Sequence, residues 1–302
     1  IERLDAGGST AGAEGIRQAY ALAEASFDAN GVNRVLLTTD GDFNVGITSR
    51  DELKGFVERK REKGIFLSVL GFGMGNYNDA LMQALAQNGN GTAAYIDTLA
   101  EARKTLVEEA TSTIVPIAKD VKLQVEFNPA QVAEYRLVGY ETRALRREDF
   151  NNDKVDAGDV GSGHTVTAIY EIVPVGGPRV NNDLRYAPAP TASPSAASEI
   201  GFLSMRYKLP KSETSQLVTT PIGGGASYAR FDDAPQEARF AVSVAGFAEL
   251  LRGGRYTGAL TYDDVIRTAT AARGDDPFGY RAEFVQLVRA AKSAGAMQAQ
   301  PR

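Results

Sequence analysis

The fold of this chain is decided by the stretch from Arg34 to Asn44, RVLLTTDGDFN. Its apolar run, Val35 to Leu37, stops abruptly at the turn Asp40-Gly41-Asp42. A short apolar run that ends in a glycine-bearing turn is typical of a buried parallel strand. Open α/β sheets bind ligands at the edge where such strands end. The stretch therefore predicts a parallel sheet with carboxylates at its carboxyl edge.

A helix is predicted directly before this strand. The segment Ala6 to Gly15, AGGSTAGAEG, places Ser9 and Thr10 ahead of apolar residues that recur at helical spacing. Hydroxyl groups at the start of a helix cap it or bind a metal ion. We expect Ser9 to serve as a cap. Thr10 and Asp40 offer oxygen ligands of the hard kind that Mg²⁺, Mn²⁺ or Ca²⁺ accept.

Helices and strands continue to alternate through the N-terminal third of the chain. Ser49 and Thr98 each begin a capping box. Two further strands are predicted at Phe66 to Phe72 and at Ala93 to Ile96. The first helix is expected to end at Asn30-Gly31. This alternation predicts a parallel sheet covered by helices.

The pattern changes after Pro116. Residues Val121 to Phe127, VKLQVEF, alternate strictly between apolar and polar, as in an antiparallel strand with one wet face. Further strands are predicted at Val132 to Val138, Thr165 to Val173, Phe202 to Leu209 and Gln216 to Thr220. Together they predict a sandwich or a small barrel.

The C-terminal end is predicted to be helical. Apolar residues recur at helical spacing from Phe240 to Leu251 and from Tyr280 to Ala291. A capping box at Thr261 begins a helix between them. We expect the residues after Gly295 to fray. Ahead of these helices, residues 176–198 are rich in Pro, Ala, Ser and Asn and are predicted to form a disordered loop.

These patterns divide the chain into three segments. We predict a truncated, Rossmann-like α/β domain over residues 1–115 and a β-rich domain over residues 116–232. A helical segment is predicted over residues 233–302.

Composition excludes several classes of function. The 302 residues include no cysteine, which excludes thiol catalysis, disulfides and thiolate metal sites. The net charge of −5 argues against nucleic acid as a partner, because phosphate binding needs a concentrated basic face. No apolar run approaches the length of a transmembrane segment.

Three stretches of the N-terminal part resemble a von Willebrand factor type A domain. They are AGGSTAGAEGI, VLLTTDGDFNVG and LSVLGFGMGNYND. In that family a metal-ion-dependent adhesion site takes one Thr from the loop before the helix and one Asp from the strand-end Thr-Asp-Gly. The resemblance implies these metal-binding roles for Thr10 and Asp40. Asp42 and Asn44 are expected to hold the loop or to contact a metal-bound water.

The first metal loop of that family, Asp-x-Ser-x-Ser, does not occur in this sequence. Asp5-Ala-Gly-Gly-Ser9 comes nearest but has a different spacing. We expect the missing loop to lie upstream of Ile1, so that the chain is an N-terminally truncated fragment. Two oxygen ligands leave a six-coordinate Mg²⁺ mostly hydrated, so we expect weak metal binding, or none, by this chain alone.

The C-terminal part resembles a largely uncharacterised, envelope-associated group of bacterial von Willebrand factor type A proteins. The resemblance rests on KDVKLQVEFNPAQVAEYRLVGYETRAL, DFNNDKVDAGDVGSGHTVTAIYEIVP and DPFGYRAEFVQLVRAA. It implies a location in the cell envelope, in the periplasm or on the outer surface. The combined prediction is a non-enzymatic binding module in which a protein partner supplies a carboxylate to the metal. A metal-independent structural protein with a degenerate site is the alternative.

A phosphatase is a further alternative, from another class of protein. Asp40-Gly41-Asp42 matches the Asp-x-Asp of haloacid-dehalogenase-like enzymes, in which the first Asp attacks phosphorus and the second handles the proton. Such an enzyme also needs a hydroxyl after the next strand, where Leu70-Gly-Phe-Gly offers none. Its later acidic pair could come only from Asp275-Asp276, in the helical end.

Three other motifs are predicted to be structural. Asp149-Phe-Asn151-Asn-Asp153 imitates half of an EF-hand loop, but Lys154 replaces the required glycine and Val160 the bidentate Glu, so we expect a polar turn. His164, the single histidine, is expected to be a structural hydrogen-bonding residue. The glycines of GFGMG, Gly71, Gly73 and Gly75, are expected to form tight backbone turns.

Overall fold

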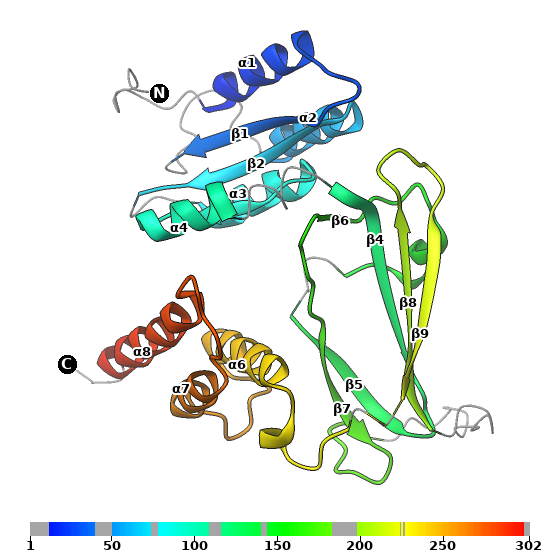
Figure 1. Ribbon diagram of the computed structural model, residues 1–302, viewed down its shortest axis with the longest axis vertical. Coiled ribbons are helices and arrows are strands. Elements are labelled where there is room, and N and C mark those ends of the chain that lie inside the picture. Colours follow the sequence, from blue (N-terminus) through cyan, green and yellow to red (C-terminus); the bar gives the residue numbers. More distant parts are fainter. Residues whose placement is uncertain are drawn as a thin grey trace. The chain divides into compact units, whose positions relative to one another are not determined.

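The computed structural model describes residues 12–39, 50–73, 78–108, 116–139, 144–182, 198–223, 225 and 227–298 (Figure 1). The chain forms two compact units, and neither is continuous in sequence. The first comprises residues 1–123, 148–164 and 205–217, and the second comprises residues 124–147, 165–204 and 218–302. The three segments predicted above are continuous in sequence, with boundaries after residues 115 and 232. This division stays a prediction.

The N-terminal part of the first unit is an α/β layer, as predicted. Strands β1 (Asn33–Thr39), β2 (Ile65–Gly71) and β3 (Ala93–Tyr95) form a parallel sheet in the order β1-β2-β3. The helices are α1 (Gly12–Ala25), α2 (Arg50–Glu62), α3 (Asp79–Asn88) and α4 (Leu99–Arg103), which continues as the π-helical turn η1 (Lys104–Glu108).

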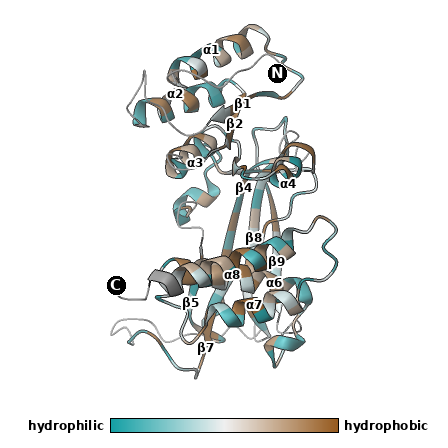
Figure 2. Cartoon of the chain, turned by 90° about the vertical axis from the view of Figure 1, so that its left-hand side faces the viewer, coloured by the Kyte–Doolittle hydropathy of each residue, from teal (hydrophilic) through white to brown (hydrophobic). Residues whose placement is uncertain are grey.

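One face of this sheet carries the core of the layer. Val35 of β1 and Leu67 and Val69 of β2 lie on the same face, because alternate residues of a strand point the same way. Buried residues of three helices pack against them: Ile16, Tyr20, Leu53, Val57, Leu81, Met82, Leu85 and Ala86. The amphipathic pattern of α1 can be followed in Figure 2. The apolar run that predicted β1 is therefore the run that places the strand in the core.

The β-rich part contains two antiparallel arrangements. The strands are β4 (Pro116–Phe127), β5 (Val132–Val138), β6 (Gly158–Gly161), β7 (Ile169–Pro174), β8 (Glu199–Lys208) and β9 (Gln216–Gly223), with a 3₁₀ helix η3 (Arg147–Asn151). One sheet has the order β6-β4-β8-β9, and β5 pairs with β7. The antiparallel, β-rich character expected after Pro116 is confirmed.

Three helices form a small core of their own in the second unit. They are α6 (Gln236–Leu251), α7 (Tyr262–Ala271) and α8 (Tyr280–Gln298), preceded by the 3₁₀ turn η6 (Phe231–Asp233). Phe247, Val265 and Val288, one from each helix, are buried together. Thr261 and Asp264 form the predicted capping box at the start of α7. No helix in the described part of the chain has the length and apolar character needed to cross a membrane.

Several predicted boundaries are wrong. Helix α1 ends at Ala25 instead of Asn30, because Asn33 exchanges two hydrogen bonds with the backbone of Asp28 and closes a turn there. Strand β7 begins at Ile169, four residues after the predicted start at Thr165, and helix α8 continues past Gly295 to Gln298. Strand β6 was not predicted. Most of the predicted loop, residues 183–197, lies outside the described residues.

Substitution of Gly91 tests how closely the turn between α3 and β3 packs against the central strand. A Cβ atom at Gly91 would lie 1.9 Å from the carbonyl oxygen of Leu67 in the central strand, whereas a Cβ at the exposed Gly15 of α1 would meet nothing within 4 Å. We expect Gly91→Ala to lower the free energy of unfolding by about 2 kcal/mol or more through overpacking. Gly15→Ala should raise it by about 0.5–1 kcal/mol. Urea unfolding measures both, and equal effects of the two variants would contradict this packing.

Substitution of Tyr20 tests the energetic cost of a buried hydroxyl group in the core. Its side chain is fully buried and contacts Phe56 edge-on, and no described residue bonds its hydroxyl. Because an unpaired buried hydroxyl costs about 1–3 kcal/mol, we expect Tyr20→Phe to raise the free energy of unfolding by about 1 kcal/mol. Tyr95→Phe, which removes a hydroxyl that donates to the carbonyl of Gly73, should lower it. A loss of stability in Tyr20→Phe would mean that its hydroxyl is hydrogen-bonded.

Candidate functional site

The predicted metal site belongs to the carboxyl edge of the parallel sheet. Thr39 pairs with Gly71, and Gly71 pairs with Tyr95, so the three strands end at one edge. The amide of Phe72 donates to the carbonyl of Thr39 at 2.9 Å, which extends the pairing past the strand ends. Figure 1 shows that α1 begins on the side to which the arrowheads of β1 and β2 point. The start of α1 and the end of β1 therefore lie toward the same edge.

The two predicted metal ligands, Thr10 and Asp40, lie outside the described residues. Asp40 directly follows Thr39, the last residue of β1, and Thr10 precedes α1, which begins at Gly12. Ser9, Asp42 and Asn44 also lie outside the described residues. The metal-binding roles of Thr10 and Asp40 stay predictions, and the described structure places the elements on either side of them.

The glycine-rich turn after β2 has a conformational role at Gly73. This residue has φ of 84°, in the left-handed region that favours glycine. Its carbonyl accepts a hydrogen bond from the hydroxyl of Tyr95. Gly71 is the last residue of β2, and Gly75 lies outside the described residues. The prediction of a tight backbone turn is confirmed for Gly73.

The EF-hand-like stretch is a polar turn, as predicted. The ammonium group of Lys122 donates to the carbonyl oxygens of Asp149 and Asn152, at 3.2 and 2.5 Å. The carboxylate of Asp153 accepts the amide of Ser215 at 3.2 Å. Of the side-chain oxygen atoms that a calcium ion would use, that of Asn151 accepts a hydrogen bond from Arg206 and one of Asp153 accepts the amide of Ser215.

Asp276 has a structural position, whereas the structural role expected of the His164 side chain stays a prediction. His164 is exposed, and its backbone amide donates to the carbonyl of Gly161 at 3.1 Å. The carboxylate of Asp276 accepts the amides of Arg281 and Ala282 at the start of α8, at 3.2 and 2.8 Å. Asp276 thus caps a helix. Among the described residues, no group of three or more His, Asp or Glu side chains is arranged to hold a metal ion.

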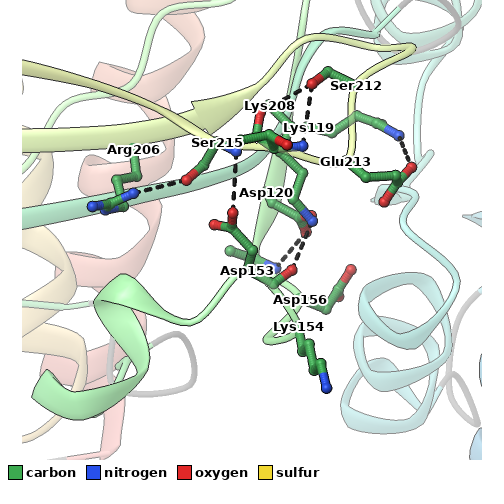
Figure 3. Close-up of polar contacts among 12 residues, drawn as sticks. Lys119, Asp120, Asp153, Lys154, Asp156, Arg206, Lys208, Ser212, Glu213 and Ser215 are labelled. Carbon is green, nitrogen blue, oxygen red and sulfur yellow. Dashed lines mark hydrogen bonds and ion pairs between the residues drawn. The ribbon is translucent and has the colours of Figure 1, made fainter.

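The first unit contains a cluster of charged residues that the sequence did not predict (Figure 3). We call Asp120, Asp153, Asp156, Asp159 and Lys208 the charged cluster. The ammonium group of Lys208 lies 2.7 Å from a carboxylate oxygen of Asp120 and donates to the carbonyl of Asp153 at 2.7 Å. The amide of Asp120 donates to the carboxylate of Asp159 at 3.2 Å. These contacts join β4, β6 and β8.

Electrostatics within the charged cluster divide its carboxyl groups into two kinds. The pKa of Asp159 is raised to about 6, first by burial and then by the nearby charges of Asp156 and Asp120, against the opposing hydrogen bond from the Asp120 amide. Burial also raises the pKa of Asp156. Hydrogen bonds from Ser215 instead hold the pKa of Asp153 below its usual range. Asp159 is therefore the member that changes charge in weakly acidic solution.

The signal for the charged cluster in the sequence is faint. Aspartates recur at every third position in DKVDAGD, residues 153–159. That spacing does not reveal Lys208 and Asp120, which come from strands distant in sequence. The cluster could be found only after the pairing of β4 with β6 was known.

Substitution of Lys208 tests how much the charged cluster contributes to the free energy of unfolding. Its side chain is 6% exposed and that of Asp120 is 17% exposed. We expect Lys208→Met to lower the free energy of unfolding by about 3 kcal/mol, because it leaves a largely buried carboxylate without its cation. The control is Lys211→Met, at an exposed position. In thermal unfolding, Asp120→Asn should restore part of the loss in the Lys208→Met background; additive losses would contradict the pairing.

The arrangement of helices and strands defines the structural class of the protein. This is an α/β protein with a parallel sheet, to which an antiparallel β-rich region and a three-helix region are attached. The family follows from comparison with known sequences. The family model described as "Uncharacterized protein YfbK, C-terminal" matches residues 112–294, more than half of the chain. The chain belongs to this family.

A curated relative extends the similarity over nearly the whole chain. The uncharacterized protein YfbK of Escherichia coli (strain K12) is 45% identical over 293 residues, which are 96% of this chain and 50% of that protein. The chain therefore spans half the length of this relative. The similarity expected to an uncharacterised bacterial group is confirmed, and a biochemical activity does not come with it.

One solved structure is a more distant neighbour. It is titled "von Willebrand factor type A from Catenulispora acidiphila", and the alignment covers 95% of this chain and 64% of that chain. The sequence identity is 15% and the TM-score is 0.43. An overlap of this quality defines no site.

Proposed function

We propose that this chain is part of a non-enzymatic protein-binding module whose affinity depends on a divalent cation. The observation that carries the proposal is the common edge where β1 ends and toward which α1 begins, because Asp40 and Thr10 adjoin these two ends. Their oxygen atoms suit Mg²⁺ or Mn²⁺, and Ca²⁺ with a larger ligand set. A carboxylate from a protein partner would complete the coordination. From the family resemblance we also propose that this module acts in the bacterial cell envelope.

The rest of the coordination would come from outside this sequence. Two protein oxygens leave most positions of an octahedral ion to water, so binding by the chain alone should be weak. In the resembling family a further loop carries Asp-x-Ser-x-Ser, and we expect the intact natural protein to supply it. The relevant protein for any binding measurement is therefore the intact one.

The experiment compares Asp40→Asn with Asp42→Asn in the intact protein that contains this chain. We expect Asp40→Asn to weaken Mn²⁺ binding by tenfold or more in calorimetry, because it removes a direct anionic ligand. Asp42→Asn, which makes the same charge change two residues away, should have a smaller effect. Capture of a protein partner from envelope extract should fail when EDTA is added and recover when excess Mg²⁺ is restored.

Two outcomes would replace the proposal. Capture of the same partner with and without EDTA would favour a structural protein with a degenerate metal site. That alternative is also consistent with a sequence that offers only two metal ligands. Hydrolysis of a generic aryl phosphate that is lost in Asp40→Asn would favour the phosphatase. The described residues give that enzyme little support, since Asp276 caps a helix.

A further inference from the structure

The segment Asn152–Gly161 is attached to the parallel sheet through its aspartates. Asp156 pairs with Arg61 of α2, with 2.9 Å between nitrogen and oxygen. The carboxylate of Asp159 accepts the side-chain amide of Asn90, in the turn before β3, at 3.5 Å. A short ladder joins the same segment to β4 of the antiparallel sheet, and its register shifts twice between Pro116 and Val121. The contacts with the parallel sheet and its helices are therefore made by side chains, beside an irregular backbone ladder with β4.

This attachment brings like charges together. The carboxyl groups of Asp156 and Asp120 each raise the pKa of Asp159, and the charge of Asp120 raises that of Asp156. Asp120 is held in place by a left-handed backbone with φ of 51°, and its carboxylate also accepts the amide of Ala157 at 3.1 Å. The three carboxyl groups cannot move apart while the segment stays attached. Crowded carboxyl groups of this kind favour sharing a proton.

The positively charged groups around the three carboxyl groups already have partners of their own. Lys208 pairs with Asp120, Arg61 with Asp156, and Lys119 of β4 pairs with Glu213 at 3.7 Å. Arg34 of β1 faces Asp159, and its guanidinium donates to the hydroxyl of Ser68 at 2.6 Å. These cations, with the amide of Asn90, are the groups that face the carboxyls from the neighbouring elements. No direct ion pair within the described structure neutralises Asp159 in the way that Lys208 neutralises Asp120.

We propose that Asp120, Asp156 and Asp159 form a pH-sensitive attachment: protonation of Asp159 tightens the hold of residues 152–161 on the parallel sheet, and its ionisation loosens it. Asp159 is at the centre of this attachment because its carboxylate accepts both the side-chain amide of Asn90 and the backbone amide of Asp120. Asp156 acts in the same direction but less, because 40% of its side chain is exposed and water screens its charge.

The direction of the effect follows from linkage. A carboxyl group with a higher pKa in the attached state favours attachment when it is protonated. That contribution is complete below the ordinary value of 3.8 and is lost as the pH rises through about 6. Asp153, whose pKa is lowered, has the opposite effect, but only in more acidic solution. Between pH 7.5 and pH 5 the segment should therefore become more firmly attached.

Hydrogen–deuterium exchange of residues 152–161 tests the proposal in the full chain. After correction for the intrinsic pH dependence of exchange, protection in the wild type should be roughly tenfold greater at pH 5 than at pH 7.5. Asp159→Asn imitates the protonated side chain, so its protection should be high at both pH values. The matched control is Asp149→Asn, which removes one carboxylate next to this segment but outside the three-carboxyl group and should keep the wild-type pH dependence.

Two results would overturn the proposal. One is wild-type protection that does not change between pH 5 and pH 7.5, and the other is a pH dependence in Asp159→Asn that is as large as in the wild type. A second measurement does not rely on any variant folding. The side-chain carboxyl ¹³C resonance of Asp159 should titrate with a midpoint near 6, and a midpoint near the ordinary value of 3.8 would equally overturn the proposal.

Discussion

The parallel pairing of β1 with β2 is the constraint on which the rest of the first unit depends. The two strands are in register from Asn33 and Ile65 to Thr39 and Gly71, and every residue of β2 except Phe66 is buried. This register fixes both ends of the sheet at once. The carboxyl edge adjoins the predicted metal ligands, and the amino edge presents Arg34 to the charged cluster. Apolar burial of one central strand thus sets the position of both candidate sites.

The parts of the fold that were predictable depend on residues close in sequence. The apolar run of β1, the N-cap of Thr98, the capping box of Thr261 and the bounds of β5 involve interactions between residues a few positions apart. Such patterns give the class of each element and the order of helices and strands. The family resemblance then added Thr10 and Asp40, which periodicity alone marks only as oxygen-bearing residues near element ends.

The unpredicted features depend on contacts between distant parts of the chain. Strict alternation in VKLQVEF predicts that Leu123 faces the core and Lys122 faces water. The structure has the opposite: Leu123 is 44% exposed and Lys122 is 4% exposed. The reason lies at least 27 residues away, where the carbonyl oxygens of Asp149 and Asn152 bind the Lys122 ammonium. A buried lysine is stable only with such partners, and a local pattern cannot reveal them.

The two candidate sites lie at opposite ends of the same strands, which bears on how they could influence each other. Arg34, near the start of β1, faces Asp159, whereas Thr39 ends the strand beside the predicted metal loop. Coupling between distant sites needs an element with two stable arrangements. A central strand buried on both sides and paired along its whole length offers no second arrangement. Protonation at the amino edge should therefore change the hold on residues 152–161 and leave the carboxyl edge as it is.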